Sequence, residues 1–219
     1  MSHSHYDVIF SKSEERMNTL THFVGVLFGV VALIFLVIKA CGSGLAVNVV
    51  SCVIFAVSII ILYASSSLYH MLSDGKAKRF FRALDHLSIY LLIAGTYTPV
   101  ALIMVKNPYS WIIFGILWGL VVLGFAYKLI FFHSGWLSTF IYIMMGWTAL
   151  GFIVQVIEAL PLGALMLILL GGVIYTSGTI FYMLDEQIKY AHALWHLFVL
   201  AGTVCHVLAV YLYIAGMKH

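Results

Sequence analysis

Charge is scarce in this chain. Only 9% of its 219 residues are Asp, Glu, Lys or Arg, whereas 63% are hydrophobic. Because a soluble domain has about 25% charged residues, this composition excludes an ordinary water-soluble enzyme. The net charge of +3 is small, and the loops are too short to present a basic surface, so we expect no nucleic-acid partner.

Cysteine is also rare. The chain has three cysteines, Cys41, Cys52 and Cys205, which stand far apart in or beside apolar segments. This spacing is not typical of a disulfide framework or of a thiolate metal site. Any metal ion is therefore expected to be held by nitrogen and oxygen ligands.

The apolar residues form seven runs, each about as long as a helix that crosses a bilayer. In hydrocarbon the backbone can be satisfied only within helices or closed barrels, and these runs lack the alternation of barrel strands. The expected fold is all-α, a bundle of seven transmembrane helices. Pro99 lies inside the third run and should kink or loosen that helix. The expected spans are 20–38, 45–70, 84–105, 111–132, 137–157, 162–184 and 193–215.

Lys and Arg are distributed unequally between the two sides of this bundle. The N-terminal side has Lys12, Arg16, Lys76, Lys78, Arg79, Arg82, Lys128 and Lys189, whereas the other side has Lys39, Lys106 and Lys218. Since the richer side usually faces the cytoplasm, the N-terminus is predicted to be cytoplasmic and the C-terminus outside. The expected organisation is a cytoplasmic segment (1–19), a seven-span domain (20–215) and a short outside tail (216–219).

Ionisable side chains gather at the predicted cytoplasmic ends of three spans. His70 ends the second span, Asp85 begins the third, and His192 and His196 begin the seventh. Ionisable groups are costly inside a membrane and usually mark functional sites. Because these residues lie at one depth, we expect them to meet.

The spacing of these residues is typical of a metal site. His192 and His196 are four residues apart in HALWH, so both imidazoles lie on one helix face, about 6 Å apart along its axis. Ser66 lies one turn from His70 on the same face. Three imidazoles with one open position are typical of catalytic zinc, which acidifies a bound water. Asp85 is then placed to orient or deprotonate that water, and Ser66 to bond to it or to the substrate.

Each of these residues has a simpler interpretation when it is taken alone. A single histidine near a membrane surface often snorkels or bonds to the backbone, and Asp85 could cap the third span. Other polar residues are expected outside the ligand set: His86 projects away, and His206 lies roughly 15 Å further across the membrane. His22 is a candidate neighbour of the site, and Glu15 is close enough to pair with its rim.

These residues, in this order, resemble the progestin and adipoQ receptor family and specifically its bacterial branch named haemolysin III. The pattern consists of Ser66-x-x-x-His70, Asp85 at the start of the third span, and His192-x-x-x-His196 at the start of the seventh. The similarity extends from about residue 14 to the end of the chain and includes the segments TLTHFVG and DHLSIYLLIAGTYTP.

The resemblance implies a zinc ion bound by His70, His192 and His196 near the cytoplasmic face of a bacterial inner membrane. It places Asp85 and Ser66 beside the zinc-bound water. The family is grouped with alkaline ceramidases, which implies membrane lipids as substrates and a zinc-dependent, ceramidase-like amidase that hydrolyses a lipid amide or ester.

Two alternatives to a hydrolase stay open. The zinc could be structural and tie the spans of a non-enzymatic membrane sensor or regulator together, with Asp85 as a fourth ligand. The protein could instead permeabilise membranes, as the name of the branch suggests, although the outer halves of the spans offer few polar side chains for a path across.

Overall fold

Seven helices of this protein are long and apolar enough to cross a membrane, which confirms the predicted all-α bundle. The computed structural model describes residues 10–105, 108–130 and 135–218. Lys106 and the last two residues of the predicted fourth span lie outside this part. The elements are α1 (Lys12–Cys41), α2 (Ala46–Met71), α3 (Lys76–Pro99), the π-helix η1 (Val100–Met104), α4 (Tyr109–Ile130), α5 (Gly135–Gly146), the 3₁₀ helix η2 (Thr148–Phe152), α6 (Ile153–Ala159), α7 (Leu162–Met183) and α8 (Ala191–Tyr213).

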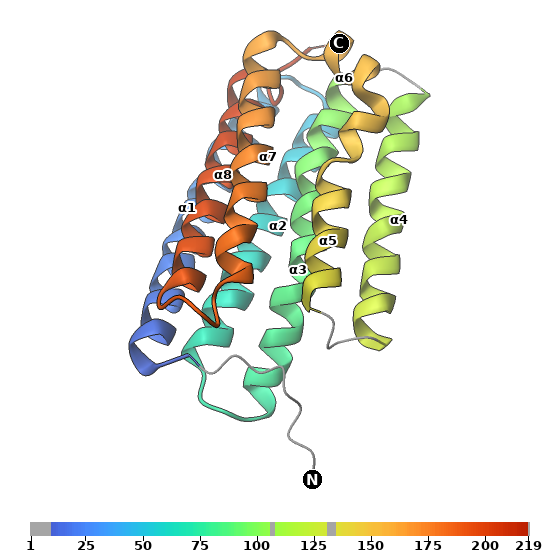
Figure 1. Ribbon diagram of the computed structural model, residues 1–219. Coiled ribbons are helices and arrows are strands. Elements are labelled where there is room, and N and C mark those ends of the chain that lie inside the picture. The colour runs from blue at the N-terminus through green and yellow to red at the C-terminus, as the bar shows by residue number, and fades with distance from the viewer. Residues whose placement is uncertain (1–9, 106–107, 131–134, 219) are drawn as a thin grey trace.

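The helices run up and down the bundle as antiparallel neighbours (Figure 1). At the lower end, as drawn there, α1, α3, α5 and α8 begin and α2, α4 and α7 end. Helix α2 packs between α1 and α3, and α8 packs between α1 and α7. This order brings the end of α2 and the starts of α3 and α8 to the lower end of the bundle.

Small residues let α1 and α2 approach closely. A side chain at Gly25 would collide with the ring of Tyr63, and one at Gly29 would press on Ile59. Close backbone contact of this kind drives helix association in lipid, where the surroundings are as apolar as the helices. The Gly25-x-x-x-Gly29 pair therefore holds α1 against α2 and positions the residues at the lower end of α1.

Helix α1 is longer at its N-terminus than the apolar run predicts. It begins at Lys12 because Ser11 and Glu14 form a capping box, in which each side chain bonds to the other residue's backbone N–H. The predicted polar segment before residue 20 is therefore partly helical. The two extra turns place Glu15 and Asn18 on a helix that packs against α2 and α8.

The third span is loosened where Pro99 was expected to act. The α-helix ends at Pro99 and continues as a π-helix over Val100–Met104. Proline removes a backbone donor and its ring crowds the preceding turn, so the wider helix follows directly from the residue type.

The fifth span is broken, whereas its continuous apolar run predicts one helix. It consists of α5, η2 and α6, and the break follows Gly146. The hydroxyl of Tyr97 on α3 donates to the carbonyl of Gly146 at 2.6 Å and accepts from the N–H of Ala149 at 3.1 Å. Unsatisfied backbone groups are very costly in a membrane, so this hydroxyl makes the break tolerable.

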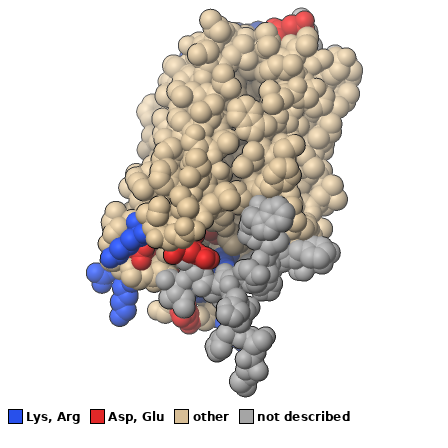
Figure 2. Space-filling model, viewed as in Figure 1, with Lys and Arg blue, Asp and Glu red and all other residues tan. Residues whose placement is uncertain are grey.

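Charged side chains gather at the lower end of the bundle. On the face shown in Figure 2 the surface above them is uncharged almost to the upper end. Exposed large hydrophobic residues such as Ile38, Val122 and Leu162 cover the sides of the helices. A surface of this kind suits contact with lipid along the sides and with water at the ends.

Candidate metal centre

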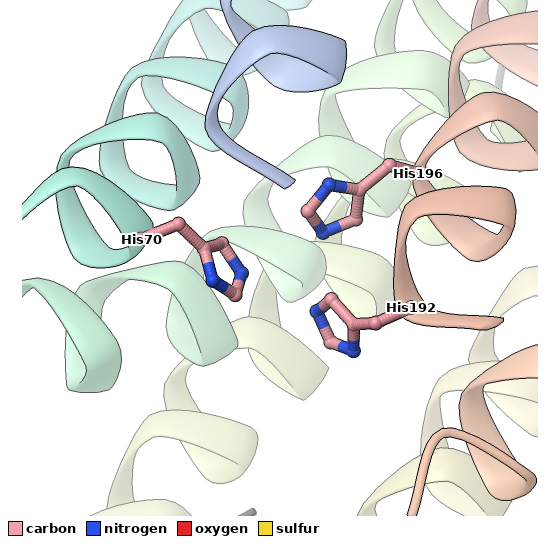
Figure 3. A group of neighbouring side chains, drawn as sticks. All are labelled: His70, His192 and His196. Atoms are coloured by element: carbon pink, nitrogen blue, oxygen red, sulfur yellow. The ribbon is translucent and has the colours of Figure 1, made fainter. Parts of the chain in front are cut away.

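Three histidine rings from two helices meet at the lower end of the bundle. His70 lies in the last turn of α2, and His192 and His196 lie in the first two turns of α8. All three are buried, and one ring nitrogen from each lies within 4.8 Å of the others. Figure 3 shows the three rings turned toward one shared space. This cluster could hold a metal ion.

Two of the histidines are held by carboxylates. Nδ1 of His70 lies 2.6 Å from a carboxylate oxygen of Glu15, and Nδ1 of His192 lies 2.8 Å from one of Asp185. Glu15 comes from α1, and Asp185 comes from the turn that joins α7 to α8. Both ring orientations are therefore fixed by residues outside the helices that carry the histidines.

The third histidine is held by the backbone of α1. Nδ1 of His196 lies 3.1 Å from the carbonyl oxygen of Asn18 and 3.1 Å from the hydroxyl of Thr21. The ring of His22 stacks on that of His196, with 3.5 Å between ring centroids and 16° between the planes. Helix α1 thus fixes both the in-plane direction and the tilt of this imidazole.

These contacts determine which nitrogen of each ring is available to a metal. Carboxylate and carbonyl oxygens accept hydrogen bonds, so Nδ1 carries the proton in all three rings and Nε2 keeps its lone pair. Metal-binding histidines usually donate their other N–H in this way. Nε2 of His70 is buried, and no described residue hydrogen-bonds to it. A set of three such imidazoles fits zinc or a similar transition metal.

Glu15 also joins the cluster to α3. Its second carboxylate oxygen accepts from Nζ of Lys78 at 2.6 Å, and the same ammonium donates to the carbonyl of Leu72. A partly buried carboxylate is stable only if its charge is compensated by partners such as these. One glutamate therefore connects α1, α2 and α3 around His70.

The start of α8 is fixed by an unusual backbone conformation. Tyr190, directly before the helix, is the only non-glycine residue with positive φ in the described part of the chain, at 64°. Its N–H donates to the carboxylate of Glu14 at 3.1 Å. Residues held in this region of φ and ψ cost free energy and often lie beside functional sites. The conformation sets the direction in which α8, and hence His192, enters the bundle.

Asp85 and Ser66 lie beside the cluster and outside the ligand group. Both line the same cavity as His192 and His196. Among the residues that the structure describes, the metal-type group contains the three histidines and not Asp85. Ser66 lies near Asp85, but its buried hydroxyl forms no hydrogen bond of good geometry with a described residue. Both residues thus line the space that a molecule in the cavity would occupy.

The cavity beside the histidines has a charged end and an end lined mainly by aromatic rings. Its volume is about 450 Å³, which lies in the range of small-molecule sites. The lower end, at the cluster, also includes Arg82 and Lys128, whereas the deep end is formed by Trp147, Gly172 and His206. A cavity of this kind suits an amphipathic molecule with its polar group at the histidines.

The chain matches one known protein family over most of its length. A model of the family described as "Haemolysin-III related" matches residues 10–207. The chain belongs to this family. The match includes all the helices that supply the histidines and their hydrogen-bond partners.

Two bacterial relatives of this haemolysin-III-related protein match over almost their whole length. "Hemolysin-3 homolog" of Bacillus subtilis (strain 168) is 40% identical over 207 residues, which is 94% of this chain and 96% of that protein. "Hemolysin-3" of Bacillus cereus is 40% identical over 203 residues, 92% of each chain. The human "Monocyte to macrophage differentiation factor" is 26% identical over 74% of this chain and 69% of its own.

The same arrangement of seven helices occurs in a thermophilic rhodopsin. Its crystal structure aligns with 92% of this chain and 94% of its own, with a TM-score of 0.60 and 16% sequence identity. This likeness shows a rhodopsin-like fold.

The structure also locates the other polar residues of this haemolysin-III-related protein. His86 is outside the histidine cluster, as expected, although it lines the neighbouring cavity and does not project away from it. His206 is outside it too, but it lines the same cavity, where its Nε2 donates to the carbonyl of Ile168. His22 packs on a member of the cluster, and Glu15 reaches His70 itself and not only the rim.

Three histidine partners, Asn18, Thr21 and Asp185, were missed from the sequence. Asp185 lies seven residues before His192, and an acidic residue so near a candidate ligand is a signal that could have been used. Asn18 contributes its backbone carbonyl, which any residue has, so no sequence signal identifies it.

Proposed function

We propose that this protein is a zinc-dependent hydrolase of a lipid amide or ester bond. The observation that carries the proposal is the orientation of the three histidine rings. Each has its Nδ1 bonded to an oxygen and its Nε2 available, at the charged end of a cavity whose other end is lined mainly by aromatic rings. The metal-type group lacks Asp85, which supports an open position more than a closed structural site.

His70, His192 and His196 would hold the metal, and the neighbouring residues would handle the proton. Bound zinc would supply a Lewis acid and lower the pKa of water toward 7. Asp85 accepts a proton from the attacking water, and the Ser66 hydroxyl hydrogen-bonds to the acyl oxygen of the substrate. Glu15, Asp185 and the Asn18 carbonyl hold the imidazoles in one tautomer.

The reaction is an ordinary hydrolysis. The water oxygen forms a bond to the acyl carbon, and the bond from that carbon to the amide nitrogen or ester oxygen breaks. The proton taken up by Asp85 passes to the leaving amine or alcohol, so the products are a fatty acid and a neutral lipid fragment. A carboxyl group that alternates between base and acid in this way typically contributes about 10²–10⁴-fold to the rate.

The proposed location is a bacterial inner membrane, with the lower end of the bundle in the cytoplasm. The excess of Lys and Arg at that end supports this orientation. Cys41, exposed at the upper end of α1, offers a direct test. It should react with a membrane-impermeant maleimide added to intact cells. The double variant Cys41→Ser/Ser73→Cys should react only after the cells are opened. The reverse result would overturn the orientation.

Hydrolysis can be tested with purified protein in phosphatidylcholine vesicles that contain N-acylsphingosine. We expect the protein to release free fatty acid, to lose this activity with a chelator and to regain it with zinc. Protein that binds zinc and cleaves neither the amide nor the phosphatidylcholine esters would overturn the proposal. That result would instead favour a structural metal that ties α2 and α8 together.

A further inference from the structure

The deep end of the cavity has a defined floor. The Trp147 indole N–H donates to the Thr176 hydroxyl at 3.0 Å, and Nε2 of His206 lies 3.1 Å from the Ile168 carbonyl. The Tyr175 hydroxyl bonds to Thr203 at 2.7 Å. These bonds between neighbouring helices leave Nδ1 of His206 as a buried polar atom without a partner among the described residues. The aromatic residues of the floor otherwise offer mainly ring surface to the cavity.

The cavity is deep enough to hold an extended lipid acyl chain. His192 lies at its polar end and His206 at its deep end, 14 residues apart on α8, which is about 21 Å along the helix axis. Half of a bilayer's hydrocarbon core is about 15 Å thick. The cavity is thus deeper than the hydrocarbon of one leaflet, so only a long, extended acyl chain with its carbonyl group at the histidines would reach Trp147 and His206.

Gly172 keeps this deep end open. A side chain at the adjacent Gly171 would collide with the ring of His206, which shows that α7 and α8 touch there. At Gly172 a Cβ atom would meet only the indole of Trp147, at 3.9 Å. Gly172 lines the cavity, so a larger side chain at this position would fill space that a ligand could otherwise occupy.

We propose that Gly172, facing Trp147, sets the maximum length of the acyl chain that the cavity accepts. The inference rests on the proposed function, because it assumes a lipid with its scissile bond at the histidines. The Gly172→Leu side chain would occupy the place of the last methylene groups of a long chain. Short chains would bind as before, since they end before reaching Gly172.

The test measures binding and requires no hydrolysis. Radiolabelled hexadecanoate is bound to the purified full-length protein and displaced by saturated fatty acids from decanoate to octadecanoate. In wild type, affinity should rise with chain length until the cavity is filled. In Gly172→Leu, decanoate affinity should be unchanged, and the longest chains should lose about fourfold for each methylene that no longer fits.

Gly119 on α4 provides the matched control. It also has open space where a Cβ would be, but it is not among the residues that line the cavity. Gly119→Leu should keep the wild-type length profile. Gly172→Ala, whose added atom makes only ordinary contact with Trp147, should show the same shift on a smaller scale and provides the test if Gly172→Leu does not fold.

Several outcomes would overturn the proposal: an unchanged length profile in Gly172→Leu, an equal loss of affinity at every length, or no fatty-acid binding by wild type. A wild-type protein that binds the series but hydrolyses no lipid would contradict the proposed function and leave the length determinant intact. The two failures are therefore distinguishable.

Discussion

Helix α8 carries histidines to both ends of the cavity, and the two ends surround them differently. At the lower end His192 and His196 are joined by His70, and charged or carbonyl oxygens hold their Nδ1 atoms. At the deep end His206 stands alone among aromatic rings, and its Nε2 bonds to a carbonyl within the bundle. Histidine side chains are therefore oriented to bind a metal at one end of the cavity and form part of its wall at the other end.

The difference between the two ends shows that neighbours, and not residue type, decide the role of a histidine in a membrane. A histidine whose ring N–H has an oxygen acceptor and whose other nitrogen faces further imidazoles is prepared to bind a metal. A histidine without other ligands nearby is only a polar group that needs one partner. Variants at one end of the cavity can therefore be compared with variants at the other end.

Removing the carboxyl group beside the cluster should have the largest effect. Asp85→Asn keeps the shape of the side chain but cannot accept the proton, so we expect lipid hydrolysis to fall by about 10²–10⁴-fold. Bound zinc should stay the same, because Asp85 is outside the ligand group. The measurement is fatty-acid release from N-acylsphingosine, together with metal content.

The control for this variant is Asp74→Asn, an exposed aspartate in the loop between α2 and α3. It should leave hydrolysis unchanged. If Asp85→Asn lost its metal together with its activity, Asp85 would be a ligand and the distinction between ligand and proton acceptor would be wrong.

Removing the carboxylate that accepts from a histidine N–H should have a smaller effect, which is on zinc affinity. Asp185→Ala frees the His192 ring to rotate and to change tautomer, so zinc affinity should fall by about 10–100-fold. Competition with a zinc chelator measures the affinity. Glu186→Ala, one residue further along the same turn, should stay close to wild type, and an equal loss in both variants would point to general damage to the turn.

A substitution in the deep half of the bundle should lower the free energy of unfolding and leave metal binding unchanged. Tyr97→Phe removes the hydroxyl that bonds to Gly146 and Ala149 at the break in the fifth span. Two backbone groups at the break would lose their partner within a membrane span, where no water replaces it, at a cost of about 1–3 kcal/mol. Unfolding of the purified protein with a denaturing detergent measures this cost.

Tyr109→Phe, the same change at a residue that is 44% exposed at the start of α4, is the reference for the Tyr97 variant. It should be nearly neutral, and zinc affinity should be unchanged in both. Equal stability of the two variants would mean that the broken span does not depend on Tyr97.

Much of the fold followed from the sequence because its signals are local. Runs of apolar residues long enough to span a bilayer predict helices, and the four-residue separation of His192 and His196 places them on one helix face. The meeting of these residues with His70 followed from their common depth. Each of these inferences needs only residues that are close together in the chain or at the same level in the membrane.

The remaining features depend on contacts between distant residues. Glu15 is 55 positions from His70, and Asn18 is 178 positions from His196. The break after Gly146 lies in an uninterrupted apolar run and is tolerated because of Tyr97 on another helix. No local pattern encodes which helix lies beside which, so these partners and the depth of the cavity required the structure.

The metal content of three purified proteins tests the central claim most directly. Elemental analysis should find close to one zinc per chain in wild type and almost none in His196→Ala. His206→Ala, the same substitution on the same helix at the other end of the cavity, should retain the wild-type content. Zinc that persists in His196→Ala, or that is lost equally in both variants, would contradict a metal centre formed by His70, His192 and His196.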